Sequence, residues 1–76
     1  MNDKQFELAA ELARLSALSW NHTAARYVLV CGLTHTAAAY KCDIARPTVT
    51  KAVKRIKQTI AQAQQLAASI NQQEEP

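Results

Sequence analysis

The sequence predicts an all-α fold: a compact bundle of four to five helices that contains a helix-turn-helix and has a long C-terminal helix. Three observations support this fold class. Apolar residues recur at the three- and four-residue spacing of amphipathic helices through most of the 76 residues. The single glycine and the one internal proline fall where a helix can end or begin. No stretch of useful length alternates apolar and polar residues as a strand does.

The length limits the chain to one small domain, assigned to residues 1–70, followed by a polar tail over residues 71–76 that we expect to fray. A domain of this size buries only about 60% of the surface that its unfolded chain exposes, so a partner subunit would add needed stability. Two cysteines are too few for a secreted disulfide framework, and no signal peptide or membrane span is expected. A cytoplasmic homodimer with no membrane contact is the prediction.

The first helix is expected from about Asp3 to Ser19, because Asn2 and Gln5 can form a capping box at its start. Its broad apolar face comprises Phe6, Leu8, Ala9, Leu12, Ala13 and Leu15. This pattern predicts a helix that packs against the core.

A second helix is expected from a cap at Asn21 to about Cys31. Gly32 follows it, where a helix commonly ends in a left-handed residue.

The third helix is short, starting at Thr34 or Thr36 and ending near Cys42. A fourth starts between Ala45 and Pro47, because proline is tolerated in the first turn of a helix. No glycine or further internal proline interrupts it, so this helix is predicted to be the long one.

The third and fourth helices together predict the helix-turn-helix. Two helices that cross steeply need a small residue at their closest approach, and Ala39 lies four positions before the turn at Asp43. Glycine is common at that turn position, but aspartate tolerates left-handed geometry better than most residues. Val49, Ala52 and Val53 are expected on the inner face of the fourth helix.

Positive charge concentrates on this unit. Residues 26–57 hold seven of the nine lysines and arginines but one of the six acidic residues, so they carry +6 while the whole chain carries +3. Such asymmetry is typical of a nucleic-acid-binding surface.

The outer face of the fourth helix offers side chains that can read base pairs. Arginine and lysine pair with guanine O6 and N7, and threonine offers a hydroxyl and a methyl group. Helix-turn-helix proteins use the N-terminal residues of this helix for base contacts. Predicted base-reading residues are Arg46, Pro47, Thr48, Thr50 and Lys51. Predicted phosphate contacts are His35, Thr36, Lys41, Lys54 and Arg55.

A longer pattern runs through this region: ARYVLVCG at residues 25–32, alanine at position 39, and RPTVTKAVKRI at residues 46–56. This pattern resembles the KorA/TrfB family of small plasmid-encoded helix-turn-helix repressors. The resemblance needs no insertion and covers a little under half of the chain.

The resemblance implies that Arg46 and Lys51 occupy operator-contact positions. The chain also departs from the family's pattern. Pro47 and Asp43 stand where the family has glycines, Ala45 where it has threonine, and Lys51 where it has a glutamine that recognises bases. The operator sequence therefore cannot be carried over. We also expect no counterpart of the separate C-terminal dimerisation segment of better-known members.

From Val49 onward the apolar residues alternate in steps of four and three, a heptad pattern that can pair two helices. Its first part must close the monomer core, which leaves residues 58–70 as the predicted dimerisation segment, alone or together with the first helix. The alternative is that this segment folds back on the first helix and covers Leu8, Leu12 and Leu15. Predicted dimer contacts are Ile60, Ala63, Leu66, Ala67 and Ile70.

No residue pattern indicates catalysis, a cofactor or a metal. No nucleophile stands beside an evident base, and there is no glycine-rich phosphate loop. The possible zinc ligands match no common spacing; they are His22, Cys31, His35 and Cys42. We expect both cysteines to be small buried groups, and Trp20 and Tyr27 to be packing residues.

These observations predict a sequence-specific double-stranded DNA-binding transcriptional repressor that binds a palindromic operator as a homodimer and blocks promoter access. The resemblance adds plasmid or mobile-element genes and a bacterial cytoplasm, on nucleoid or plasmid DNA. The alternatives are a DNA-binding activator, a partition or relaxosome accessory protein, or a helical adaptor that does not bind DNA. The sequence identifies no co-repressor.

Overall fold

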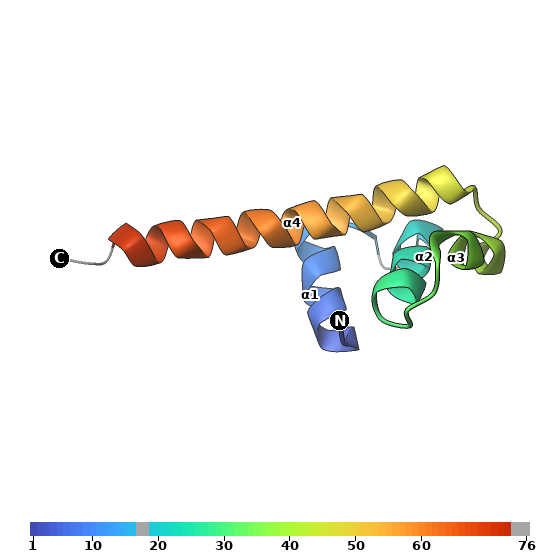
Figure 1. Cartoon of the computed structure of the whole chain (residues 1–76), viewed down its shortest axis with the longest axis horizontal. Coiled ribbons are helices and arrows are strands. Elements are labelled where there is room, and N and C mark those ends of the chain that lie inside the picture. The colour runs from blue at the N-terminus through green and yellow to red at the C-terminus, as the bar shows by residue number, and fades with distance from the viewer. Residues whose placement is uncertain (17–18, 74–76) are drawn as a thin grey trace.

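Four helices form the regular secondary structure of the residues described in this computed structural model, 1–16 and 19–73 (Figure 1). The first three helices pack against the N-terminal half of the fourth, whose C-terminal half extends beyond them. The molecule therefore measures 53 × 20 × 20 Å. The helices are α1 (Asp3–Leu12), α2 (Trp20–Leu29), α3 (His35–Cys42) and α4 (Arg46–Gln73). The all-α bundle with a long C-terminal helix is confirmed, with four helices.

α1 begins as predicted and ends earlier than predicted. Asn2 and Gln5 form the capping box, in which the Gln5 N–H donates to Asn2 Oδ1 at 2.8 Å. The helix ends at Leu12, because Arg14 adopts a left-handed φ of 57°. The Arg14 N–H donates to the Glu11 carbonyl at 3.0 Å and the next N–H reaches the Ala10 carbonyl at 2.9 Å, a Schellman termination. The expected extension to Ser19 was therefore wrong, and residues 17–18 within it lie outside the described residues.

The N-cap of α2 lies two residues before the predicted cap at Asn21. Ser19 is the N-cap, and its Oγ accepts from the His22 N–H at 3.2 Å. The helix ends at Leu29, and Gly32 has the expected positive φ of 76°.

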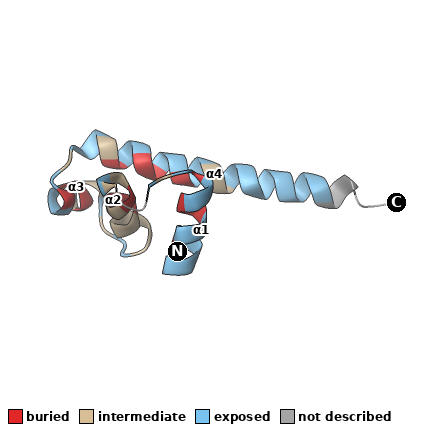
Figure 2. Cartoon of the chain, turned by 180° about the vertical axis from the view of Figure 1, so that it is seen from behind, coloured by how far each residue is buried: buried red, intermediate tan, exposed pale blue. Residues whose placement is uncertain are grey.

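The core is built largely from small side chains. Among the described residues, eight of the thirteen buried apolar side chains are alanine, so the helices can approach one another closely. Figure 2 shows the buried residues where α1, α2 and α3 meet the N-terminal half of α4. The largest fully buried side chains are Phe6, Val49, Val53 and Ile56.

The helix-turn-helix follows the predicted geometry. Ala39 of α3 is buried, as expected for the close approach of α3 and α4. Asp43 takes the left-handed conformation with φ of 53°. The turn is closed by the Ile44 N–H, which donates to the Ala39 carbonyl at 3.1 Å. Val49 and Val53 are 0% and 2% exposed, so the predicted inner face of α4 is confirmed.

The second half of α4 does not cover α1. Leu8 and Leu12 remain 56% and 65% exposed, although Leu15 is half-buried. The alternative, in which residues 58–70 fold back and cover all three leucines, is therefore wrong. α4 also continues through Gln73, into the segment predicted to fray, and residues 74–76 lie outside the described part of the chain.

Replacing Arg14 with glycine should stabilise the fold. A non-glycine residue in left-handed geometry costs about 1–2 kcal/mol, which exceeds the roughly 0.5–1 kcal/mol of extra unfolded-state entropy that glycine brings. Arg14→Gly should therefore raise the free energy of unfolding by up to about 1 kcal/mol in urea denaturation. Asp43→Gly should gain less, because aspartate tolerates this conformation better.

The control is Lys4→Gly, within α1, which should lower stability by about 1 kcal/mol. A loss of stability in Arg14→Gly equal to that of the control would contradict the left-handed termination of α1.

Candidate nucleic-acid interface

Four of the five side chains predicted to read bases lie together at the start of α4. Arg46, Pro47, Thr50 and Lys51 line one open hollow, and all four are exposed. Their spacing places them on successive turns of one face. Thr48 is half-buried and is not among the residues that line this hollow.

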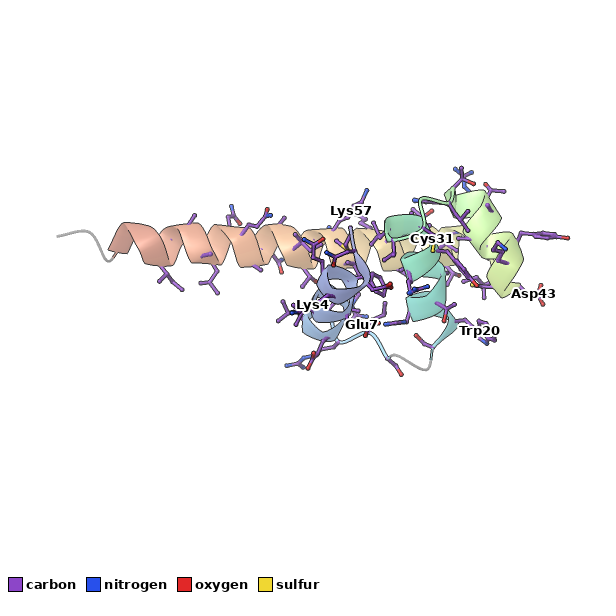
Figure 3. The ribbon with its side chains drawn as sticks, turned by 90° about the horizontal axis from the view of Figure 1, so that it is seen from below. Lys4, Glu7, Trp20, Cys31, Asp43 and Lys57 are labelled. Atoms are coloured by element: carbon purple, nitrogen blue, oxygen red, sulfur yellow. The ribbon has the colours of Figure 1, made fainter. Side chains whose placement is uncertain are left out.

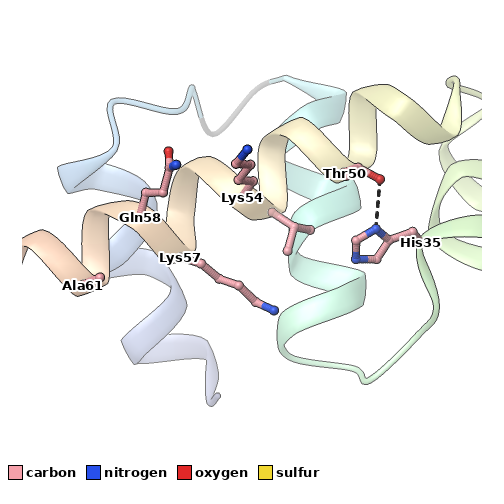
Figure 4. A pocket seen from close by; sticks show the side chains of 7 residues that line it. His35, Thr50, Lys54, Lys57, Gln58 and Ala61 are labelled. Carbon is pink, nitrogen blue, oxygen red and sulfur yellow. Dashed lines mark hydrogen bonds between the residues drawn. The ribbon is translucent and has the colours of Figure 1, made fainter.

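His35 brings the beginning of α3 to the same face. Its Nδ1 lies 3.0 Å from Thr50 Oγ1, and this hydrogen bond joins the two helices of the helix-turn-helix (Figure 4). The position of His35 is set by Thr34, the N-cap of α3, whose Oγ1 accepts from the Ala37 N–H at 3.1 Å. A helix cap thus places a polar ring beside the predicted reading residues.

A second hollow continues along α4 from the first, and Thr50 lines both. Lys54, Lys57 and Gln58 extend its wall toward the middle of α4 (Figure 4). Lys57 is an addition to the predicted contact set, and its three-residue spacing from Lys54 was the signal for it. We call the two hollows together the α4 basic surface, with polar and charged members His35, Arg46, Thr50, Lys51, Lys54 and Lys57.

The remaining predicted phosphate contacts lie around this surface. Thr36 and Lys41 are exposed on α3, and Arg55 is exposed on α4 one turn after Lys51. None of the three lines either hollow. The Lys41 ammonium lies 5.8 Å from the centroid of the Tyr27 ring, a cation–π contact that turns it toward α2.

The charged side chains in the first part of α4 are all positive. Its first twelve residues include five lysines and arginines and no acidic residue. Among the described residues, none of these five cations makes an ion pair. The Arg26–Asp3 ion pair and the contact between His22 and Glu7 both join α1 to α2. The positive end of the α4 dipole adds to the same field. This charge is free to meet an external anion.

Arg26 was counted in the basic segment of the sequence, but its charge is paired with an acidic side chain. Its Nη2 lies 2.7 Å from Asp3 Oδ1, and its Nε donates to the same oxygen at 2.8 Å. The hydrogen bond and the charge of Asp3 raise the pKa of Arg26. Arg26 therefore joins α2 to α1 and does not belong to the α4 basic surface.

The two cysteines have different environments. Cys42 is buried as expected, and burial raises the pKa of its thiol. Cys31 is exposed, because it follows the end of α2 next to Gly32, so the expectation that it is buried was wrong. Among the described residues, no three His, Cys, Asp or Glu side chains are grouped so that they could hold a metal ion.

Trp20 also differs from its predicted packing role. It is 63% exposed at the first position of α2 (Figure 3). Tyr27, in contrast, is half-buried against the core. Ser19 caps the helix one residue earlier than Trp20, which places the indole on an outer position of the first turn.

The chain matches no family model, no curated protein and no solved structure in comparisons with each. Within the described residues, no helix has both the length and the apolar character needed to cross a membrane.

The contrast between the cysteines predicts their reactivity. With an aromatic disulfide reagent at pH 8, Cys31 should react within the mixing phase, whereas Cys42 should react only as the protein opens, at least about 100-fold more slowly. Cys31→Ser should remove the fast phase alone. Equal rates for both thiols in the folded protein would contradict the burial of Cys42, and addition of denaturant should make them equal.

Proposed function

We propose that this chain is a sequence-specific double-stranded DNA-binding transcriptional repressor that acts as a homodimer on a palindromic operator. The observation that carries this proposal is the α4 basic surface. There, cations that form no ion pair within the described part of the chain stand exposed with a threonine on the second helix of a helix-turn-helix. Helix-turn-helix proteins place this helix in the major groove, with its N-terminal residues on base edges.

The side chains of the surface divide by their distance from the start of α4. Arg46, Thr50 and Lys51 stand in the first turns, where base edges are reached, and they supply donors that suit guanine and a methyl group that suits thymine. Lys54 and Lys57 lie further along the helix, where the flanking phosphates pass. The division predicts sequence reading near Arg46 and non-specific affinity near Lys57.

Repression follows from occupancy alone. A dimer whose two reading surfaces contact successive major grooves covers promoter DNA and excludes polymerase, with no need for a further activity. The resemblance of residues 25–56 to the KorA/TrfB repressors supports plasmid or mobile-element genes as the target. It also supports a bacterial cytoplasm as the location. A co-repressor is not required by this mechanism.

The direct test is a mobility-shift assay with DNA from upstream of the chain's own coding sequence, in the presence of excess competitor DNA. Arg46→Ala and Lys51→Ala should each weaken specific binding by about 5- to 150-fold, which corresponds to roughly 1–3 kcal/mol for a base contact. Lys4→Ala, which removes an exposed cation of α1, is the matched control and should leave affinity within about twofold.

Lys54→Ala should behave differently from the readers. It should weaken specific and non-specific DNA about equally, and should lower the slope of log affinity against log salt by about 1 per protomer. Specific binding that activates transcription would favour an activator, and specific binding outside promoters a partition or relaxosome accessory protein. Failure to bind any DNA would favour a helical adaptor and refute the proposal.

A further inference from the structure

An apolar groove lies where α1 meets the extended half of α4. Leu8 and Leu12 form one wall, Ile60, Ala63 and Ala67 form the other, and the groove has a volume of about 490 Å³. Beyond it, Leu66 and Ile70 are 62% and 46% exposed on α4. Figure 1 shows α4 continuing past α1 with no other helix beside it. The apolar surface therefore runs from α1 along α4 as far as Ile70.

We propose that a second copy of this chain occupies the groove, with the extended halves of the two α4 helices packed antiparallel. The contact between the two copies forms without DNA. Only its consequence for DNA binding rests on the proposed function.

The lack of charge favours a second copy over a partner of another kind. From Gln58 to Gln73 the helix has no charged residue, in contrast to the five cations of the preceding twelve residues. Neither an acidic nor a basic partner would be selected by such a surface. The two α4 segments would bury no ion against each other, so their pairing incurs no charge desolvation.

The order of residues along α4 suits an antiparallel pair. Ile60, Ala63, Ala67 and Ile70 are spaced by three, four and three residues, which reads the same in both directions. In antiparallel register Ile60 meets the partner's Ile70, and Ala63 meets the partner's Ala67. The central alanines permit a close helix approach of about 8 Å. Leu66 then lies beside the two-fold axis.

A parallel pair is disfavoured by the position of the globule that α1, α2 and α3 form around the first half of α4. Val49, Val53 and Ile56 continue the same seam toward the N-terminus, and they are covered by the chain's own α1, α2 and α3. Parallel partners would bring both globules to the same end and the same side, where they collide. Antiparallel partners place the two globules at opposite ends.

The antiparallel arrangement also explains the exposed leucines of α1. Where the partner's Ile70 lies next to Ile60, it lies next to the groove that Leu8 and Leu12 form. Five large apolar side chains, 44–65% exposed, would be covered in each copy. The covered area would total about 1,000 Å², the lower bound for a specific interface. These five are Met1, Leu8, Leu12, Leu66 and Ile70.

The two-fold axis of such a pair is perpendicular to both helices, and this matters for DNA. Thr50 and Lys54 lie about 120–160° around α4 from the middle of the seam, at 100° per residue. The axis therefore carries the α4 basic surface of one copy onto that of the other on the same side of the dimer. Along the pair the two Lys54 positions would stand roughly 33 Å apart and the two Thr50 positions roughly 45 Å apart, which brackets the 34–36 Å between half-sites one turn apart.

Sedimentation equilibrium of the full chain without DNA tests the contact. We expect a dimer, which Ala63→Glu should convert to a monomer, while the neighbouring outward-facing Gln65→Glu should leave it intact. Leu8→Gln should weaken the dimer at least tenfold, and Glu11→Gln on another face of α1 should not. Circular dichroism checks that each variant keeps its helices. A monomeric wild-type chain, or equal effects of Ala63→Glu and Gln65→Glu, would overturn the proposal.

Disulfide trapping tests the orientation, in a Cys31→Ser background that removes the exposed thiol. Ile60→Cys and Ile70→Cys should each fail to cross-link alone and should form a disulfide dimer when mixed. A parallel pair would cross-link each variant to itself, and this result would contradict the antiparallel register. DNA binding by a chain that sediments as a monomer would refute the antiparallel dimer and leave the DNA-binding role of the α4 basic surface standing. A dimer that binds no DNA would refute the proposed function alone.

Discussion

The packing of one face of α4 against α1, α2 and α3 determines what the rest of that helix exposes. Val49, Val53 and Ile56 are 0–2% exposed, and they fix the rotation of α4 about its own axis. With that rotation set, Arg46 and Lys51 must face outward at the N-terminal end. The same rotation directs the uncharged seam at the other end toward the side that α1 occupies. One buried stripe therefore orients both surfaces to which a role is proposed.

A core made mainly of alanine allows this arrangement in so short a chain. Small side chains let α3 approach α4 closely at Ala39, so the helix-turn-helix needs little apolar volume. The cost is a small core, in which Phe6 and Ile56 are the largest groups fully enclosed. Marginal stability of this kind makes a subunit contact physically useful, because each copy leaves large apolar side chains exposed on α1 and α4.

The parts of the fold that depend on local chemistry could be predicted from the sequence. The Asn2 capping box, the left-handed Gly32 and the start of α4 near Pro47 each follow from one residue and its neighbours. The end of α1 could not be predicted in this way, because the apolar pattern continues past Arg14 and only the backbone reverses there. The ion pair between Arg26 and Asp3 could not be predicted either, since the two residues lie far apart in the chain. The hydrogen bond from α3 to Thr50 depended on packing in the same way.

The central claim is that the first half of α4 meets the duplex and the second half does not. Amide chemical shifts followed by NMR during titration with an operator-length duplex measure this directly. The account predicts that the largest shifts fall on His35 and on residues 46–57, with those of residues 60–70 little changed. Shifts concentrated on α1 and on residues 60–70, with residues 46–57 unaffected, would contradict it.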